Sequence, residues 1–187
     1  MQIQQASHIE LPVFGSVSKL MTNVMNYYFH GVPTAEAPYP DQQEGVKVIS
    51  RYQKGIEPPM IFPEVDKSSG AVAFQTKDDR HMRSYIITLN CITEGINADH
   101  DAAELQEAGK EALRRAVLEQ WYFPDSGSIS YIENSSPPSR VSDWATSTGV
   151  VQMASLPEHW ARWESIHRIM VRPPRETNNK FIRNRKV

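Results

Sequence analysis

The only thiol in the chain, Cys91, lies in a strand-like stretch whose neighbouring side chains are mostly apolar. A reactive thiolate needs a positively charged and partly exposed environment, whereas a buried cysteine behaves as a small hydrophobic side chain. We therefore predict that Cys91 packs in the core and is not a nucleophile. A single cysteine also allows no disulfide within the chain, which fits a reducing compartment.

Two histidine-containing clusters have spacings that could bind a metal ion. His100 and Glu104 are four residues apart, which places both on one face of a helix. Asp78, Asp79 and His81 form a second cluster in a charge-rich segment. Both clusters fall where charged side chains are ordinarily solvated, and the sequence has no HExxH, CxxC or EF-hand spacing. We therefore predict no metal site.

Glycine spacing argues against a phosphate-binding loop. Such loops need clustered glycines before a helix, but the nine glycines are scattered, and acidic residues that would repel phosphate follow Gly95. The chain also lacks the GxSxG motif of a nucleophile elbow. We predict no catalytic residues, no cofactor and no enzyme activity.

The side chains best suited to binding another protein lie in the last third of the chain. Trp160 and Trp163 are expected on one face of a short helix, where they could join an interface or, more commonly, pack in the core. The stretch 175–187 holds five cationic side chains and one carboxylate. It could dock on a neighbouring subunit, contact nucleic-acid phosphates, or be a solvated tail without a specific role. The candidate interface residues are Trp160, Trp163, Phe181, Ile182, Arg183 and Arg185.

These residues are arranged around one central unit, residues 82–121. Alternating bulky side chains predict a strand over Ser84–Glu94, and bulk on both faces indicates a central strand with cover on each side. Gly95 and Asn97 break this pattern. Apolar residues at helical spacing from Ala98 then predict a helix of roughly 22 residues, about 33 Å long, with an acidic first turn that suits the helix dipole.

Other elements complete an α+β fold: a mainly antiparallel sheet with a long helix packed on one face, plus extended N- and C-terminal arms. A first helix is predicted from Ser16 or Ser18 to about Phe29. Pro63 predicts that its strand lies at a sheet edge or contains a bulge. Alternation favours a last strand at Ser165–Arg172 over continuation of the preceding helix. Shorter strands are predicted in 46–52, 60–65, 71–76, 129–132 and 149–154.

The length of 187 residues fits one domain with extended arms. The Asn-Ser-Ser-Pro-Pro-Ser stretch predicts a break. A net charge of −2 gives no global field for nucleic acid or membrane, and we expect neither a signal peptide nor a membrane span. The predicted divisions are an N-terminal arm at 1–15, an α+β core domain at 16–133, a C-terminal extension at 134–172 and a basic tail at 173–187.

The order of these elements, over about residues 15–125, resembles that of the tail-terminator and neck (head-to-tail completion) proteins of tailed bacteriophages. The chain departs from that pattern in its additional 121–187 region. The matching features are the first helix at Val17–Phe29, the Pro58-Pro59-Met60-Ile61 entry to the sheet, the long strand at Tyr85–Thr93 and the helix at Asp101–Glu119.

This resemblance implies a structural virion protein without an active site, assembled in the host cytoplasm. It implies a homo-oligomeric ring, most simply a hexamer, that joins the tail tube or sheath to the connector. Genomic DNA would pass through the lumen, and no membrane is involved. Two alternatives remain: a nucleic-acid-binding accessory protein that uses the basic tail, and a small enzyme whose site assembles from distant residues.

Overall fold

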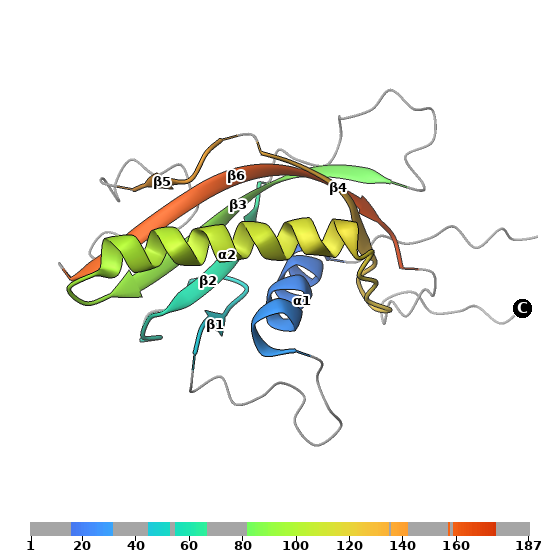
Figure 1. The fold of residues 1–187 in the computed structure, drawn as a ribbon. Coiled ribbons are helices and arrows are strands. Elements are labelled where there is room, and N and C mark those ends of the chain that lie inside the picture. Colours follow the sequence, from blue (N-terminus) through green and yellow to red (C-terminus); the bar gives the residue numbers. More distant parts are fainter. Residues whose placement is uncertain are drawn as a thin grey trace, which may run out of the picture.

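The computed structural model describes residues 16–31, 45–52, 55–66, 82–134, 136–141, 157 and 159–174. These residues form a mixed α+β fold with a six-stranded sheet and two helices, which confirms the predicted class (Figure 1). The elements are α1 (Val17–His30), β1 (Lys47–Val48), β2 (Met60–Val65), β3 (Arg83–Glu94), α2 (Ala98–Leu118), β4 (Ser128–Asn134), β5 (Ser139–Arg140) and β6 (Trp160–Arg172).

The strand order is β1-β2-β3-β6-β4, with β5 pairing β6, and only the β1–β2 pair is parallel. β3 is therefore a central strand, as predicted. Its longest contact is with β6, in an unbroken antiparallel register from Arg83 opposite Val171 to Glu94 opposite Trp160. β4 pairs the other side of β6, with a register shift between Ile129 and Tyr131.

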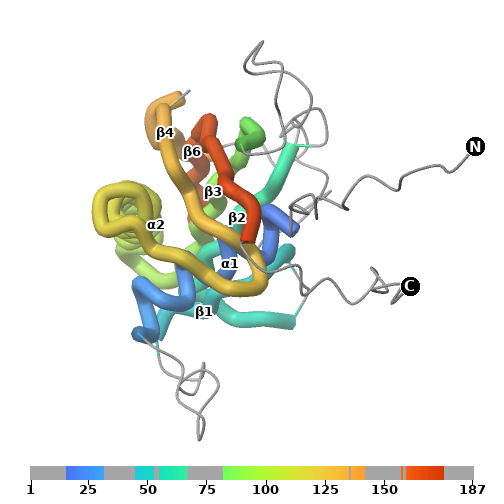
Figure 2. Tube along the Cα trace, turned by 90° about the vertical axis from the view of Figure 1, so that its right-hand side faces the viewer, coloured from blue at the N-terminus to red at the C-terminus, as the bar shows by residue number. Residues whose placement is uncertain are grey.

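Both helices pack on one face of the sheet. α2 runs lengthwise along β3 and β6, and α1 crosses beneath it (Figure 1). Figure 2 shows α2 end-on beside the row β4, β6, β3 and β2. One apolar cluster joins both helices to the sheet, and its fully buried members include Leu20, Met21, Ile61, Leu89, Leu113 and Ile169. The buried apolar side chains of α1, Val17, Leu20, Met21, Val24 and Met25, form its contact face.

The opposite face of β3 is also covered in part. Met60, Phe62 and Ile92 form a second buried cluster, against which Ile49, Tyr52, Ile56 and Trp160 pack. The segment after β1 thus covers this end of the sheet. The prediction of partial cover on both faces of the central strand is confirmed.

Local signals set the ends of several elements. The Ser16 hydroxyl accepts a hydrogen bond from the Lys19 amide at 3.4 Å and caps α1, and Gly31, at φ 79°, ends it. Asn97 occupies the N-cap position of α2 without a capping side-chain hydrogen bond. Pro63 lies beyond the two residues of β2 that pair with β1, at an edge where no strand among the described residues needs its missing N–H.

Two predictions about the C-terminal third are wrong. Trp160 and Trp163 do not lie on a helix, because β6 begins at Trp160. Residues 134–172 are not an appended extension, because β6 occupies the middle of the sheet between β3 and β4. The alternating burial of β6, with Ala161, Ser165 and His167 on the helix-covered side, is the physical reason for this placement.

Other predictions are shortened or lie outside the described residues. The strand predicted at 46–52 is reduced to Lys47–Val48, and that at 129–132 extends over Ser128–Asn134. The predicted strands at 71–76 and 149–154, the arm at 1–15 and most of the tail fall outside the described residues. Within the described residues, no helix is long and apolar enough to cross a membrane.

Candidate interaction surfaces

Of the six candidate interface residues, the structure describes Trp160 and Trp163. They lie three positions apart on β6 and therefore point to opposite faces of the sheet. Phe181, Ile182, Arg183 and Arg185 lie outside the described residues. The two tryptophans therefore do not form one aromatic patch.

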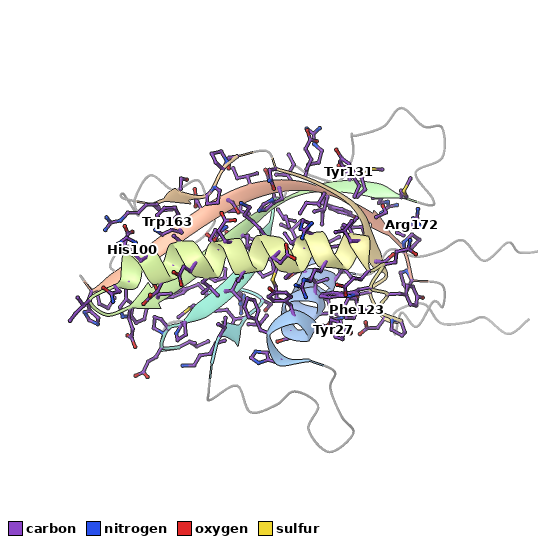
Figure 3. The ribbon with its side chains drawn as sticks, in the orientation of Figure 1. Tyr27, His100, Phe123, Tyr131, Trp163 and Arg172 are labelled. Atoms are coloured by element: carbon purple, nitrogen blue, oxygen red, sulfur yellow. The ribbon has the colours of Figure 1, made fainter. Side chains whose placement is uncertain are left out.

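Trp163 fixes the start of α2 against β6. Its ring packs against a small-residue cluster containing Ala98, Ala102 and Ala161, and its Nε1 donates to Asp99 Oδ1 at 2.9 Å. The same carboxylate forms an ion pair with Arg140, whose Nε lies 3.2 Å from Asp99 Oδ1. The Trp163 side chain is thus already engaged within the subunit, near the left end of α2 in Figure 3.

Trp160 packs against the second apolar cluster on the opposite face. Its Nε1 atom is buried and has no hydrogen-bond partner among the described residues. An unpaired buried donor costs about 1–3 kcal/mol. Whether Trp160 also contacts another subunit stays a prediction.

A chain of buried polar side chains connects α2, β6 and β4. Gln106 Nε2 donates to the Leu89 carbonyl at 3.1 Å and to the Ser165 hydroxyl. Ser165 Oγ lies 2.6 Å from His167 Nε2, and His167 Nδ1 lies 2.9 Å from Asn134 Oδ1. Since Gln106 supplies a proton to Ser165, the hydroxyl donates to His167 Nε2, and His167 donates through Nδ1 to Asn134.

This arrangement places a serine, a histidine and an asparagine in the order used by some hydrolases. Here Ser165 and His167 are both 0% exposed, so no substrate carbonyl could approach the hydroxyl. Burial lowers the His167 pKa to about 4, assisted by the positive charge of Lys110 and opposed by Glu107. His167 is therefore neutral near pH 7, and the chain of hydrogen bonds holds the three elements in register.

None of these side chains is predicted as a functional residue from the sequence. The available signal was the spacing of Ser165 and His167, two residues apart and hence on one face of a strand. Their partners Gln106 and Asn134 come from distant parts of the chain. Only the register of the folded sheet reveals them.

A second buried polar group lies on the sheet face away from α2. The Arg162 side chain is 2% exposed, and its Nε and Nη2 donate to Asn90 Oδ1 at 3.1 and 2.6 Å. Its Nη2 also lies 3.2 Å from Glu164 Oε2. Burial lowers the Arg162 pKa, opposed by the charges of Glu164 and Glu64.

The side chains considered for catalysis or metal binding are placed as follows. Cys91 is fully buried in the main core, as predicted, and burial raises its thiol pKa well above the usual value. His100 and Glu104 are both exposed on α2. His81, Asp78 and Asp79 lie outside the described residues. Among the described residues, no group of three or more histidine, cysteine, aspartate or glutamate side chains is placed to hold a metal ion.

In the part of the chain that the structure describes, two surface grooves flank α2. The first, about 460 Å³, runs between α2 and β4 and is lined by Glu107, Lys110, Glu111, Arg114, Ile132 and Asn134. The second, about 560 Å³, has a mostly apolar wall made by Phe29, Val46, Pro58, Pro59, Leu105 and Ala108. Thr93 and three carboxylates complete it: Glu94, Asp101 and Glu104. We call this second one the acidic groove.

No model of a known protein family matches the chain, and no curated protein matches it. The order of the elements and the geometry of these side chains are therefore the grounds on which a function is proposed.

Proposed function

We propose that this chain is a structural virion protein of a tailed bacteriophage, located at the head–tail junction as a tail-terminator or neck protein. The observation that carries the proposal is the order and packing of the elements over residues 17–118. A first helix is followed by the antiparallel β2–β3 pair, and α2 then returns over β3 on the same face as α1. This is the order in which the chain resembles that family.

The use of the buried polar side chains supports a structural role. Ser165 and His167 bond to each other inside the protein, and Arg162 is bonded to Asn90 on the other face. Each of these groups stabilises the packing of strands and helices. The hydrogen bonds of these buried side chains therefore support a role in holding the subunit together.

The surface supports assembly through unlike patches. The outer edge of β4 carries Tyr131, 48% exposed, and the acidic groove lies near the N-terminal half of α2. When two different patches of identical subunits meet, the contact is heterologous, and repetition closes into a ring if the rotation permits. We propose a ring, most simply a hexamer, that contacts tail tube, sheath or connector proteins and passes DNA through its lumen.

Mass spectrometry and electron microscopy of purified virions test this proposal. We expect the chain among the virion proteins, in a ring at the junction of head and tail, in a fixed copy number. Its absence from virions would overturn the proposal. A monomer in solution would not, since such subunits can remain single until they meet their partner.

A further inference from the structure

We propose that the acidic groove of one subunit binds the C-terminal tail, residues 175–187, of the next subunit in the ring. This inference rests on the proposed function, because it supplies the contact by which identical subunits would be joined. It assigns a binding partner to the groove and a role to the tail.

The groove has carboxylates without cations. Within the described part of the chain, no ion pair joins Glu94, Asp101 or Glu104 to a basic side chain. The neighbouring acids on α2 differ, because Glu107 and Glu111 are paired with Lys110, Arg114 and Arg115. The helix dipole accounts for an acid in the first turn, such as Asp101. It does not account for Glu94, which precedes the helix, or Glu104, which follows the first turn.

The groove also presents an apolar wall beside these charges. Leu105 is 7% exposed at its base, and Phe29 is partly buried at its side. Lys47 follows the groove residue Val46 in the sequence, but its Nζ already donates to the Glu57 carbonyl at 2.8 Å. A ligand suited to this surface carries an apolar side chain followed by cations.

The tail has that pattern. It contains five cationic side chains against the single carboxylate Glu176. In an extended peptide, alternate side chains point to one side, so Phe181, Arg183 and Arg185 face the same way. Phe181 would lie on the apolar wall while the two guanidinium groups meet the groove carboxylates.

The position of the groove favours a tail from another subunit. β6 spans 13 residues, or about 43 Å at 3.3 Å per residue. Its first residue, Trp160, pairs with Glu94 at the groove, and its last, Arg172, lies at the other end. Figure 3 accordingly shows Arg172 and His100 at opposite ends of α2. The thirteen residues 173–185 extend over about 45 Å at most, so Arg185 would meet Glu94 of its own groove only with the tail fully extended along the whole of β6.

A contact between the tail at one end and the groove at the other is heterologous. Each subunit uses its tail toward one neighbour and its groove toward the next, which is the geometry that a closed ring requires. The same contact without closure would give a filament.

A labelled peptide of residues 175–187 provides the direct test. It is titrated by fluorescence anisotropy against the full-length chain carrying Arg183→Glu and Arg185→Glu, whose own tail no longer matches the groove. We expect saturable binding that weakens about tenfold or more when Glu94→Lys and Glu104→Lys are added, because attraction becomes repulsion. Glu107→Lys with Glu111→Lys is the matched control, since it makes the same total charge change on α2 outside the acidic groove, and it should leave binding unchanged.

A charge-swap test uses the whole assembly. Under conditions in which the wild-type chain self-associates, we expect Glu94→Lys with Glu104→Lys to abolish self-association by analytical ultracentrifugation, and added Arg183→Glu with Arg185→Glu in the same chain to restore it. Failure of the peptide to bind, or equal binding by groove and control variants, would overturn the inference. The inference would also be overturned if deletion of the tail abolished DNA binding while the groove variants assembled normally. If the groove variants still form normal rings in virions, only this inference is contradicted. If the peptide binds but the protein is absent from virions, only the proposed function is contradicted.

Discussion

His167 is neutral in the folded protein because it is buried beneath α2 with Lys110 nearby. Its pKa falls from 6.5 to about 4, with Glu107 opposing the change. Below pH 6.5 the unfolded chain therefore binds a proton that the folded protein does not. The contribution of neutral His167 to the free energy of unfolding is fully present above pH 6.5. It decreases as the pH falls toward 4, by about 3 kcal/mol at most.

Urea unfolding between pH 7.5 and 4 measures this effect when the wild type is compared with His167→Gln. We expect the stability advantage of the wild type to shrink as the pH falls, since glutamine does not titrate. His100→Gln, on the exposed side of α2, serves as the control and should follow the wild-type profile. Identical pH profiles for His167→Gln and the wild type would contradict the assignment.

Ser165 is the link between the two ends of the same polar chain. Ser165→Ala leaves one N–H of Gln106 and the Nε2 atom of His167 without a partner in a buried site. We expect a loss of about 1–3 kcal/mol in the free energy of unfolding. Ser130→Ala is the control, because its partly buried hydroxyl donates to the Met170 carbonyl at 3.2 Å. An equal loss of unfolding free energy in the two variants would show that the series of buried hydrogen bonds adds nothing to stability.

These contacts also mark where residue-level prediction from sequence stops. Cys91 could be assigned to the core because its apolar strand neighbours are adjacent in sequence. The bond between Gln106 and Ser165 joins residues 59 positions apart. It depends on the register of β3 against β6 and on the seating of α2, neither of which local periodicity contains.

At the scale of elements, the turn between α2 and β4 depends on Gly127. Its φ is 94°, and an added Cβ would lie 2.1 Å from the Arg172 carbonyl oxygen at the end of β6. Gly127→Ala therefore combines an unfavourable backbone conformation, about 1–2 kcal/mol, with a clash against backbone that cannot rotate away. We expect a total loss of roughly 3 kcal/mol or more.

Gly95→Ala separates these two effects. Gly95 also has a positive φ, 107°, but nothing lies within 4 Å of its added Cβ. Thermal unfolding of both variants should show a loss of about 1–2 kcal/mol for Gly95→Ala and a clearly larger one for Gly127→Ala. Similar losses would mean that β6 and the turn can separate at little cost.

The elements themselves were predictable where one side of the element is buried. α1 and α2 each carry a continuous apolar stripe, and their predicted ranges match Val17–His30 and Ala98–Leu118 closely. The sequence does not predict the start of β6, because Trp160, Ala161 and Trp163 after Pro157 imitate the first turn of a helix. Packing of Trp160 and Trp163 on opposite faces of one strand overrides that local signal.

At the scale of the whole molecule, two kinds of surface could join subunits. The acidic groove offers charge, whereas Tyr131 and Met82, 48% and 39% exposed, offer apolar side chains on the sheet. The two differ in their response to salt. Exposed charge contacts are screened as the Debye length falls from about 10 Å at 0.1 M to about 3 Å at 1 M salt, while excluded salts such as sulfate strengthen apolar burial.

Sedimentation velocity over a series of sodium chloride concentrations separates the two. If the tail and the acidic groove hold subunits together, raising the salt from 0.05 to 0.5 M should weaken association by about tenfold or more. Tyr131→Ser should leave that dependence unchanged, because Tyr131 lies on β4, away from the groove. Association that is insensitive to chloride, strengthened by sulfate and lost in Tyr131→Ser would instead assign the contact between subunits to the apolar sheet face.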